Sequence, residues 1–93
     1  MIYFLHDAQK SLVKIGTSKS RETLDRRLKQ LRTANPSIEI IGTQSGDRFE
    51  ESRIHRNFQN IRRSGEWFHL EPGNPLALYL DRTFGQTKTA DRL

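Results

Sequence analysis

The stretch IYFLHDAQKSLVKIGT, residues 2–17, contains two short apolar runs separated by a polar turn. Side chains in each run alternate between two faces, as they do in a strand with one buried face. We therefore predict a β-hairpin in which Leu5 lies opposite Leu12 and Tyr3 lies opposite Lys14. The two faces of this hairpin differ in chemistry. The core face carries Ile2, Phe4, Val13 and Ile15, and the opposite face carries Tyr3, Lys14 and Gly16.

A helix and a third strand are predicted directly after the hairpin. Ser20 is suited to cap a helix over residues 21–32, whose buried stripe consists of Leu24, Leu28 and Leu31. The sequence ANPS, residues 34–37, ends this helix. The apolar run IEIIGTQ, residues 38–44, predicts the third strand.

Two further helices are predicted in the second half of the chain. Asp47, followed three residues later by Glu50, resembles a capping box for a helix that ends near Asn60. Its apolar side comprises Phe49, Ile54, Phe58 and Ile61. The segment GEWFHL, residues 65–70, predicts a short extended piece. Asn74 and Pro75 begin a last helix, whose stripe of Leu76, Leu80 and Phe84 could dock on its own domain or on a second copy.

The order of these elements predicts an α+β fold. It consists of a small antiparallel three-stranded sheet flanked by helices, with a β-β-α-β-α core, a short extra extended segment and a C-terminal helix. A chain of 93 residues has room for one modest core. We therefore predict a single domain over residues 1–84 and a flexible tail over residues 85–93.

Composition excludes several classes of protein. The chain has no cysteine, which removes disulfides, thiolate zinc sites and cysteine nucleophiles. No run approaches the roughly 18 apolar residues of a membrane span. The sequence MIYFLHDAQK also lacks the basic start and long apolar centre of a signal peptide. We therefore expect a cytoplasmic protein.

Basic residues are concentrated in two segments. The net charge is +5, from 16 Lys and Arg against 11 Asp and Glu. The first basic segment comprises Lys10, Lys14, Lys19, Arg21, Arg26, Arg27, Lys29 and Arg32, and the second comprises Arg53, Arg56, Arg62 and Arg63. Such clustering is typical of a polyanion binder, because each neutralised phosphate releases a counterion. A solvated basic face remains the alternative.

Four motifs occur in a characteristic order: IYFLHDAQKSLVKIGTS, then RRLKQL, then EESRIHRNF, then GEWF. Together they resemble the GIY-YIG nuclease superfamily, in its phage-encoded and meiotically-up-regulated-gene branch. The resemblance covers residues 1 to about 70. MIY stands at the Gly-Ile-Tyr motif and KIG at the Tyr-Ile-Gly motif, so Met1 replaces a glycine and Lys14 replaces the second tyrosine.

The resemblance implies a metal-dependent endonuclease that hydrolyses phosphodiester bonds of DNA. In this reading Tyr3 is the first motif tyrosine and assists the nucleophilic water. Arg27 is the helix arginine that stabilises the phosphate, and Glu51 binds Mg²⁺ or Mn²⁺. Lys14 and His55 complete the implied catalytic set.

Elementary chemistry is consistent with these roles. Glu51 offers a hard oxygen ligand for Mg²⁺, which keeps most of its waters. The planar guanidinium of Arg27 suits a phosphate. His55 follows Glu51 by one helical turn, so both are expected at one site. The unperturbed pKa of Tyr3 is near 10, so Tyr3 is a base only if positive charge lowers that pKa, and Lys14 is the candidate.

Contacts with DNA, double-stranded in our expectation, are assigned to Gly16, Lys19, Arg26 and Lys29. Gly16 has no side chain, so it lets the DNA backbone approach the hairpin. A homodimer or a partner protein could supply targeting, since the domain is short. Two other classes stay open: a noncatalytic nucleic-acid-binding module with the same fold, and a module that binds an acidic protein partner.

Structural explanations also stay open for individual residues. Tyr3 could be a half-buried strand tyrosine, and Glu51 could merely form a salt bridge with Arg53. Arg26 is a rival to Arg27 for the phosphate role, although the position just before Leu28 favours Arg27. His55 could be a satisfied group beside the core.

Overall fold

The computed structural model describes residues 1–85. The strands are β1 (Ile2–Asp7), β2 (Leu12–Thr17), β3 (Ile38–Gln44), β4 (Arg62–Ser64) and β5 (Trp67–His69). The helices are α1 (Arg21–Ala34), α2 (Arg48–Asn57) and α3 (Pro75–Phe84), with a 3-10 turn at Gln59–Ile61 after α2. The predicted tail, apart from Gly85, lies outside the described residues.

The sheet has five antiparallel strands in the order β3-β1-β2-β5-β4. The α+β class is therefore confirmed, whereas the prediction of a three-stranded sheet is wrong. The extended piece around GEWFHL became β5, which pairs with β2. The missed strand, β4, contains only three residues, all of them exposed. So short and polar a segment carries no hydrophobic period from which a strand can be predicted.

The hairpin pairs in a different register from the predicted one. Leu5 lies opposite Lys14 and Tyr3 lies opposite Gly16. The strands extend to Asp7 because its carboxylate accepts hydrogen bonds from the backbone N–H groups of Gln9 and Lys10, which tightens the turn. The shift amounts to two residues, so every side chain keeps its predicted face.

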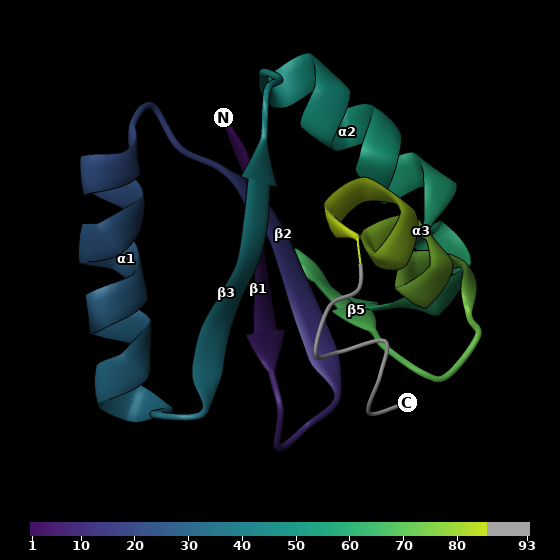
Figure 1. Cartoon of the computed structure of the whole chain (residues 1–93), viewed down its shortest axis with the longest axis horizontal. Coiled ribbons are helices and arrows are strands. Elements are labelled where there is room, and N and C mark those ends of the chain that lie inside the picture. The colour runs from purple at the N-terminus through teal and green to yellow at the C-terminus, as the bar shows by residue number, and fades with distance from the viewer. Residues whose placement is uncertain (86–93) are drawn as a thin grey trace.

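The sheet is covered on both sides. Figure 1 shows α1 against one face and α2 with α3 against the other. The larger core lies under α2 and α3 and contains Ile2, Phe4, Val13, Ile15, Ile54, Phe58, Phe68, Leu70, Leu76, Ala77 and Leu80. The core face predicted for the hairpin is thereby confirmed. The apolar stripe of α3 docks on its own domain, since Leu76 and Leu80 are buried there.

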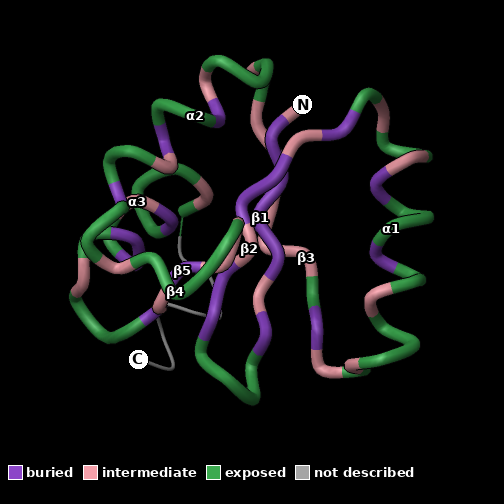
Figure 2. Tube along the Cα trace, turned by 180° about the vertical axis from the view of Figure 1, so that it is seen from behind, coloured by how far each residue is buried: buried purple, intermediate pink, exposed green. Residues whose placement is uncertain are grey.

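A second, smaller core lies under α1. It consists of Tyr3, Leu5, Leu24, Leu28 and Ile38, with Leu31 partly buried at its edge. In Figure 2 buried and exposed residues alternate along α1, as expected for a helix with one face on a sheet. This face of the sheet therefore combines a modest core with the polar positions of the hairpin.

Each helix begins at the residue that the sequence predicts. Ser20, Asp47 and Asn74 cap α1, α2 and α3 by accepting hydrogen bonds from backbone N–H groups of the first turn. Helix α2 ends at Asn57, three residues earlier than predicted, and a 3-10 turn follows. Phe49 does not belong to the apolar side of α2, because 76% of its surface is exposed.

Within residues 1–85, none of the helices has both the length and the apolar character needed to cross a bilayer.

Candidate functional site

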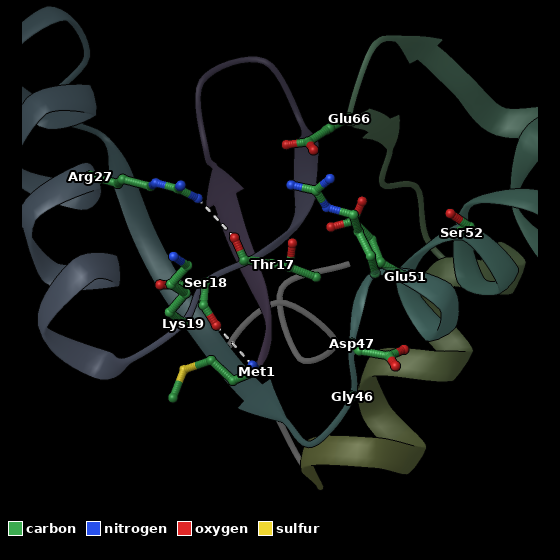
Figure 3. A pocket seen from close by; sticks show the side chains of 11 residues that line it. Met1, Thr17, Ser18, Lys19, Arg27, Gly46, Asp47, Glu51, Ser52 and Glu66 are labelled. Atoms are coloured by element: carbon green, nitrogen blue, oxygen red, sulfur yellow. Dashed lines mark hydrogen bonds between the residues drawn. The ribbon is translucent and has the colours of Figure 1, made fainter.

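A cavity of about 690 Å³ opens where β2 ends, between α1 and α2. Figure 3 shows Lys19 and Arg27 on one side of it and Asp47, Glu51 and Ser52 on the other. Thr17 lies between these two groups, and Glu66 reaches the cavity from the turn between β4 and β5. Residues from four separate parts of the chain therefore meet at this end of the sheet.

The local structure explains why both helices begin beside the cavity. The hydroxyl of Ser18 donates a hydrogen bond to the carbonyl of Ser20, and Ser20 in turn caps α1. On the other side, Gly46 and Asp47 join β3 to α2, and the Asp47 carboxylate accepts from the N–H groups of Phe49 and Glu50. The positive ends of two helix dipoles thus lie near the opening, which favours an anionic ligand.

Glu51 is the buried acidic residue of the cavity. Only 9% of its surface is exposed, and its Oε2 atom is buried without a hydrogen-bond partner in the described part of the chain. A buried polar atom without a partner costs about 1–3 kcal/mol, and more when it is charged. Such an atom is rare in a structural role, so it indicates a group that binds something other than the protein.

The charged residues of the cavity, Glu51 included, are balanced in number. Lys19, Arg27 and Arg48 carry positive charge, and Asp47 and Glu66 join Glu51 as acidic groups. Arg27 is exposed, and its Nη1 donates a hydrogen bond of 2.8 Å to the Thr17 carbonyl. This bond directs the guanidinium of α1 across the end of β2.

Tyr3 and Gly16 fit together as one unit. A Cβ atom at position 16 would lie 2.5 Å from both Cζ and Oη of Tyr3. The space left by the missing side chain is therefore filled by the tyrosine ring. Gly16 is buried, so the structure gives it a packing role, while the predicted approach by a DNA backbone stays a prediction.

Burial raises the pKa of Tyr3, because the charged phenolate loses its hydration. A hydrogen bond from Arg27 opposes this effect, while the negative charges of Glu66 and Glu51 reinforce it. The hypothesis that Lys14 lowers this pKa and makes Tyr3 a base is therefore corrected. Tyr3 is a neutral phenol near neutral pH.

Lys14 turns toward the β4–β5 hairpin. Its Nζ lies 3.8 Å from Oε1 of Glu66 and 5.8 Å from the ring centre of Trp67. Lys14, Tyr3 and Arg27 also line a smaller cavity of about 250 Å³ beside α1. Arg27 lines both this cavity and the larger one, so it connects the Tyr3 and Lys14 pair with Glu51.

His55 does not share the cavity of Glu51. Its Nε2 is 2.9 Å from the carbonyl oxygen of Ile15, and its ring packs edge-on against Phe68 at 5.0 Å. It lines a separate cavity on the far side of Ser52. The expectation that His55 and Glu51 meet at one site is wrong, because the first contact of the imidazole is with a strand backbone.

The predicted DNA-contacting residues are dispersed. Lys19 lines the large cavity, whereas Arg26 and Lys29 are exposed on α1 and line none of the cavities described above. Arg27 lines the large cavity and Arg26 does not, so the structure favours Arg27 over Arg26 for the phosphate role. These positions leave the assignment of DNA contacts as a prediction.

Sequence reasoning missed three residues of the cavity: Arg48, Ser52 and Glu66. Arg48 precedes Glu51 by three residues on α2, so helical periodicity was the available signal for Arg48. Ser52 directly follows Glu51, a spacing that does not place two side chains on the same helix face. Glu66 pairs with Lys14. Its place depends on the β4–β5 turn, which the sequence did not predict.

The donor set fits one type of metal site. Among residues 1–85 there is no group of three or more histidines and acidic residues that could hold a metal ion. The unsatisfied oxygen of Glu51 fits an ion such as Mg²⁺, which accepts one or two carboxylates and keeps its waters and substrate oxygens as further ligands.

A cavity that combines basic side chains with an unsatisfied carboxylate offers groups with which proteins bind phosphates and divalent cations. The model of the T5orf172 domain matches residues 1–79 of this chain. The chain belongs to the T5orf172 domain family. This family comprises nuclease-like and DNA-binding domains, which is consistent with a function related to nucleic acids. No curated protein and no solved structure matches the chain.

The family match corrects the assignment to the GIY-YIG superfamily. That assignment rested on short motifs around Tyr3, Arg27 and Glu51, whereas the family model that matches is that of the T5orf172 domain. The roles discussed below rest on the geometry of the cavity.

Proposed function

We propose that this protein is a metal-dependent endonuclease that hydrolyses phosphodiester bonds of DNA at the Glu51 cavity. The observation that carries the proposal is the buried, unpartnered Oε2 of Glu51 in a cavity that also contains Lys19, Arg27 and Arg48. A carboxylate alone would repel a phosphate. The three basic groups offset the three carboxylates of the cavity, and the N-terminal ends of α1 and α2 add partial positive charge that favours a phosphodiester.

Glu51 would hold a Mg²⁺ or Mn²⁺ ion. When bound, this ion supplies positive charge that stabilises the transition state and favours attack by water. Arg27 and Arg48 approach the cavity from opposite helices, so they orient the phosphate between α1 and α2 and stabilise its developing negative charge.

Tyr3 assists the nucleophilic water as a neutral phenol. The guanidinium of Arg27 has only N–H donors, so in their hydrogen bond the phenol oxygen accepts. The phenol proton stays available for a hydrogen bond of its own. Lys14 holds Glu66 beside the cavity and thereby positions this carboxylate, while His55 supports β2 through the Ile15 carbonyl.

A noncatalytic nucleic-acid-binding module is the second candidate. One observation favours it: within the described residues, no set of three metal-ligating side chains surrounds Glu51. The basic residues of the cavity would then bind a phosphate without hydrolysing its ester. The two candidates differ in a single measurable property, which is turnover in the presence of a divalent cation.

Cleavage of supercoiled plasmid at low salt separates the two candidates. We expect the wild-type protein to nick or linearise the plasmid with Mg²⁺ or Mn²⁺ and to be inactive in EDTA. Glu51→Gln should lower the rate at least about 100-fold, and Arg27→Ala should lower it about 10²–10³-fold. Asp25→Asn is a matched control, because Asp25 is an exposed carboxylate that pairs with Arg21 on the outside of α1.

The outcomes discriminate clearly. Cleavage that survives in Glu51→Gln would refute the assigned metal residue. A wild-type protein that shifts the plasmid on a gel but does not cleave it with either cation is the noncatalytic binder. A protein that does neither would support the third reading, a module for an acidic protein partner. Gel filtration of the same sample tests whether the domain acts as a homodimer.

A further inference from the structure

A second cavity lies on the outer side of α2. It has a volume of about 310 Å³ and is lined by Ser52, His55, Arg56, Gln59 and Arg62. None of these five described residues is acidic. The lining offers two guanidinium groups, a hydroxyl and an amide, which are the groups that bind phosphate oxygens in proteins.

The two arginines of this cavity differ in their anchoring. Arg62 is fixed, since its Nε donates to the carbonyl of Gly65 at 2.6 Å and its guanidinium lies 5.9 Å from the ring centre of Phe68. Arg56 is exposed, and its side chain makes no hydrogen bond or ion pair with any residue in the described range. One guanidinium is thus positioned in advance and the other is available to close on a ligand.

The second cavity adjoins the first through one residue. Ser52 lines both cavities, so it forms part of the wall between them. Arg56 follows Glu51 by five residues, which corresponds to about 7.5 Å along the axis of α2. Phosphates of one strand of B-DNA are spaced by about 3.4 Å along its axis. An offset of roughly two nucleotides therefore separates the two positions.

We propose that Arg56 and Arg62 clamp one backbone phosphate of the same nucleic-acid strand whose phosphate about two nucleotides away occupies the Glu51 cavity. This phosphate site rests on the nucleic-acid part of the proposed function and does not require hydrolysis. The strand runs along the outer side of α2, past Ser52. The site binds a phosphodiester backbone, so it contributes affinity without distinguishing one base sequence from another.

The test is the salt dependence of DNA binding in EDTA, with the full chain and a labelled short duplex followed by fluorescence anisotropy. EDTA stops metal-dependent cleavage but leaves ionic contacts intact. The double variant Arg56→Gln with Arg62→Gln should bind about tenfold more weakly. The slope of log K against log salt should fall by about one, because one phosphate contact is lost.

Two further variants make the test specific. Arg82→Gln removes an exposed positive charge from the last turn of α3, and it should leave the slope unchanged. Arg62→Gln could disturb the turn at Gly65, so Arg56→Gln alone is measured as well, and it should show at least half of the loss in slope. Circular dichroism confirms that each variant is folded.

Each result decides the proposal. A slope that falls equally in Arg82→Gln reflects net charge alone and overturns the site. A fall of about two in the double variant means two separate phosphates and overturns the shared clamp. A wild-type chain that does not bind the duplex also overturns it. A protein without cleavage that nevertheless loses one unit of slope keeps this site while the proposed hydrolysis fails.

Discussion

Two buried carboxylates, Asp7 at the turn of the hairpin and Glu51 at its open end, differ in how their oxygens are satisfied. Asp7 is 3% exposed and accepts hydrogen bonds from the side chains of Asn35 and Ser37 and from two backbone N–H groups of the turn. Glu51 is 9% exposed, and its Oε2 has no partner in residues 1–85.

This difference separates a structural carboxylate from one that is available for chemistry. The bonds of Asp7 join the β1–β2 turn to the turn between α1 and β3, so its negative charge is used within the fold. The charge of Glu51 is directed to a cavity instead. Burial alone therefore does not identify a functional residue. Burial combined with an unsatisfied atom is the stronger indication.

The largest effect on stability is expected at Asp7. Asp7→Ala should lower the free energy of unfolding by about 3 kcal/mol, because it leaves several buried donors without an acceptor. Urea unfolding followed by circular dichroism measures this change. Asp25→Ala, on the exposed side of α1, should stay within about 0.5 kcal/mol of wild type. Equal losses in the two variants would contradict the distinction drawn for Asp7.

Substitution of Gly16 tests whether packing at the end of the hairpin next to the cavity also stabilises the fold. Gly16→Ala should cost about 2 kcal/mol, since its Cβ would overlap the Tyr3 ring. A double variant that also carries Tyr3→Leu should recover part of that loss, because leucine leaves the ring position empty. Urea unfolding of both variants gives the coupling free energy. Simple additivity of the two changes would argue against a Gly16–Tyr3 contact.

Replacing Glu51 should raise the free energy of unfolding, whereas replacing Asp7 should lower it. Glu51→Gln replaces a buried charge by a neutral amide, so the free energy of unfolding in EDTA should rise by up to about 1 kcal/mol. Thermal unfolding with and without Mg²⁺ extends the test. The cation should raise the midpoint of the wild-type protein but not that of Glu51→Gln. A clear loss of stability in Glu51→Gln would place this residue in the same structural class as Asp7.

Much of the fold could be predicted because it depends on local signals. The alternation of side chains between two faces in residues 2–17 predicted both faces of the hairpin. The caps Ser20, Asp47 and Asn74 predicted where the helices begin. Each of these signals depends on a few neighbouring residues, so it can be recognised from the sequence. The register was missed because it depends on how the Asp7 side chain closes the turn.

The candidate site was predictable only in part, since it depends on contacts between distant segments. Arg27 and Glu51 were identified and do line one cavity. His55 was misplaced because helical spacing gives the face of a helix but not the strand carbonyl that its ring meets. Arg48 and Glu66 line the cavity because of how α2 and the β4–β5 turn pack in the fold. No pattern within a single segment encodes that packing.

The smallest effect is expected from Tyr3, and it appears only in alkali. Burial raises the pKa of Tyr3 in the folded protein above its value of about 10 in the unfolded chain. Between these two pKa values the unfolded chain releases the proton and the folded protein keeps it. The unfolded state then binds fewer protons, so stability is complete below the unfolded pKa and falls as pH rises toward the folded pKa.

The contribution of Tyr3 to this alkaline loss is at most about 1.4 kcal/mol per pH unit, and Tyr3→Phe should remove it. Urea unfolding across the alkaline range measures the slope. Tyr79→Phe is the matched control, since Tyr79 is the other tyrosine of the chain and donates its hydroxyl proton to Gln44. If Tyr3→Phe keeps the wild-type slope and Tyr79→Phe loses it, the buried neutral phenol beside Arg27 has been assigned to the wrong residue. If Tyr3→Phe alone flattens the slope, Tyr3 is the buried phenol whose raised pKa causes the alkaline loss of stability.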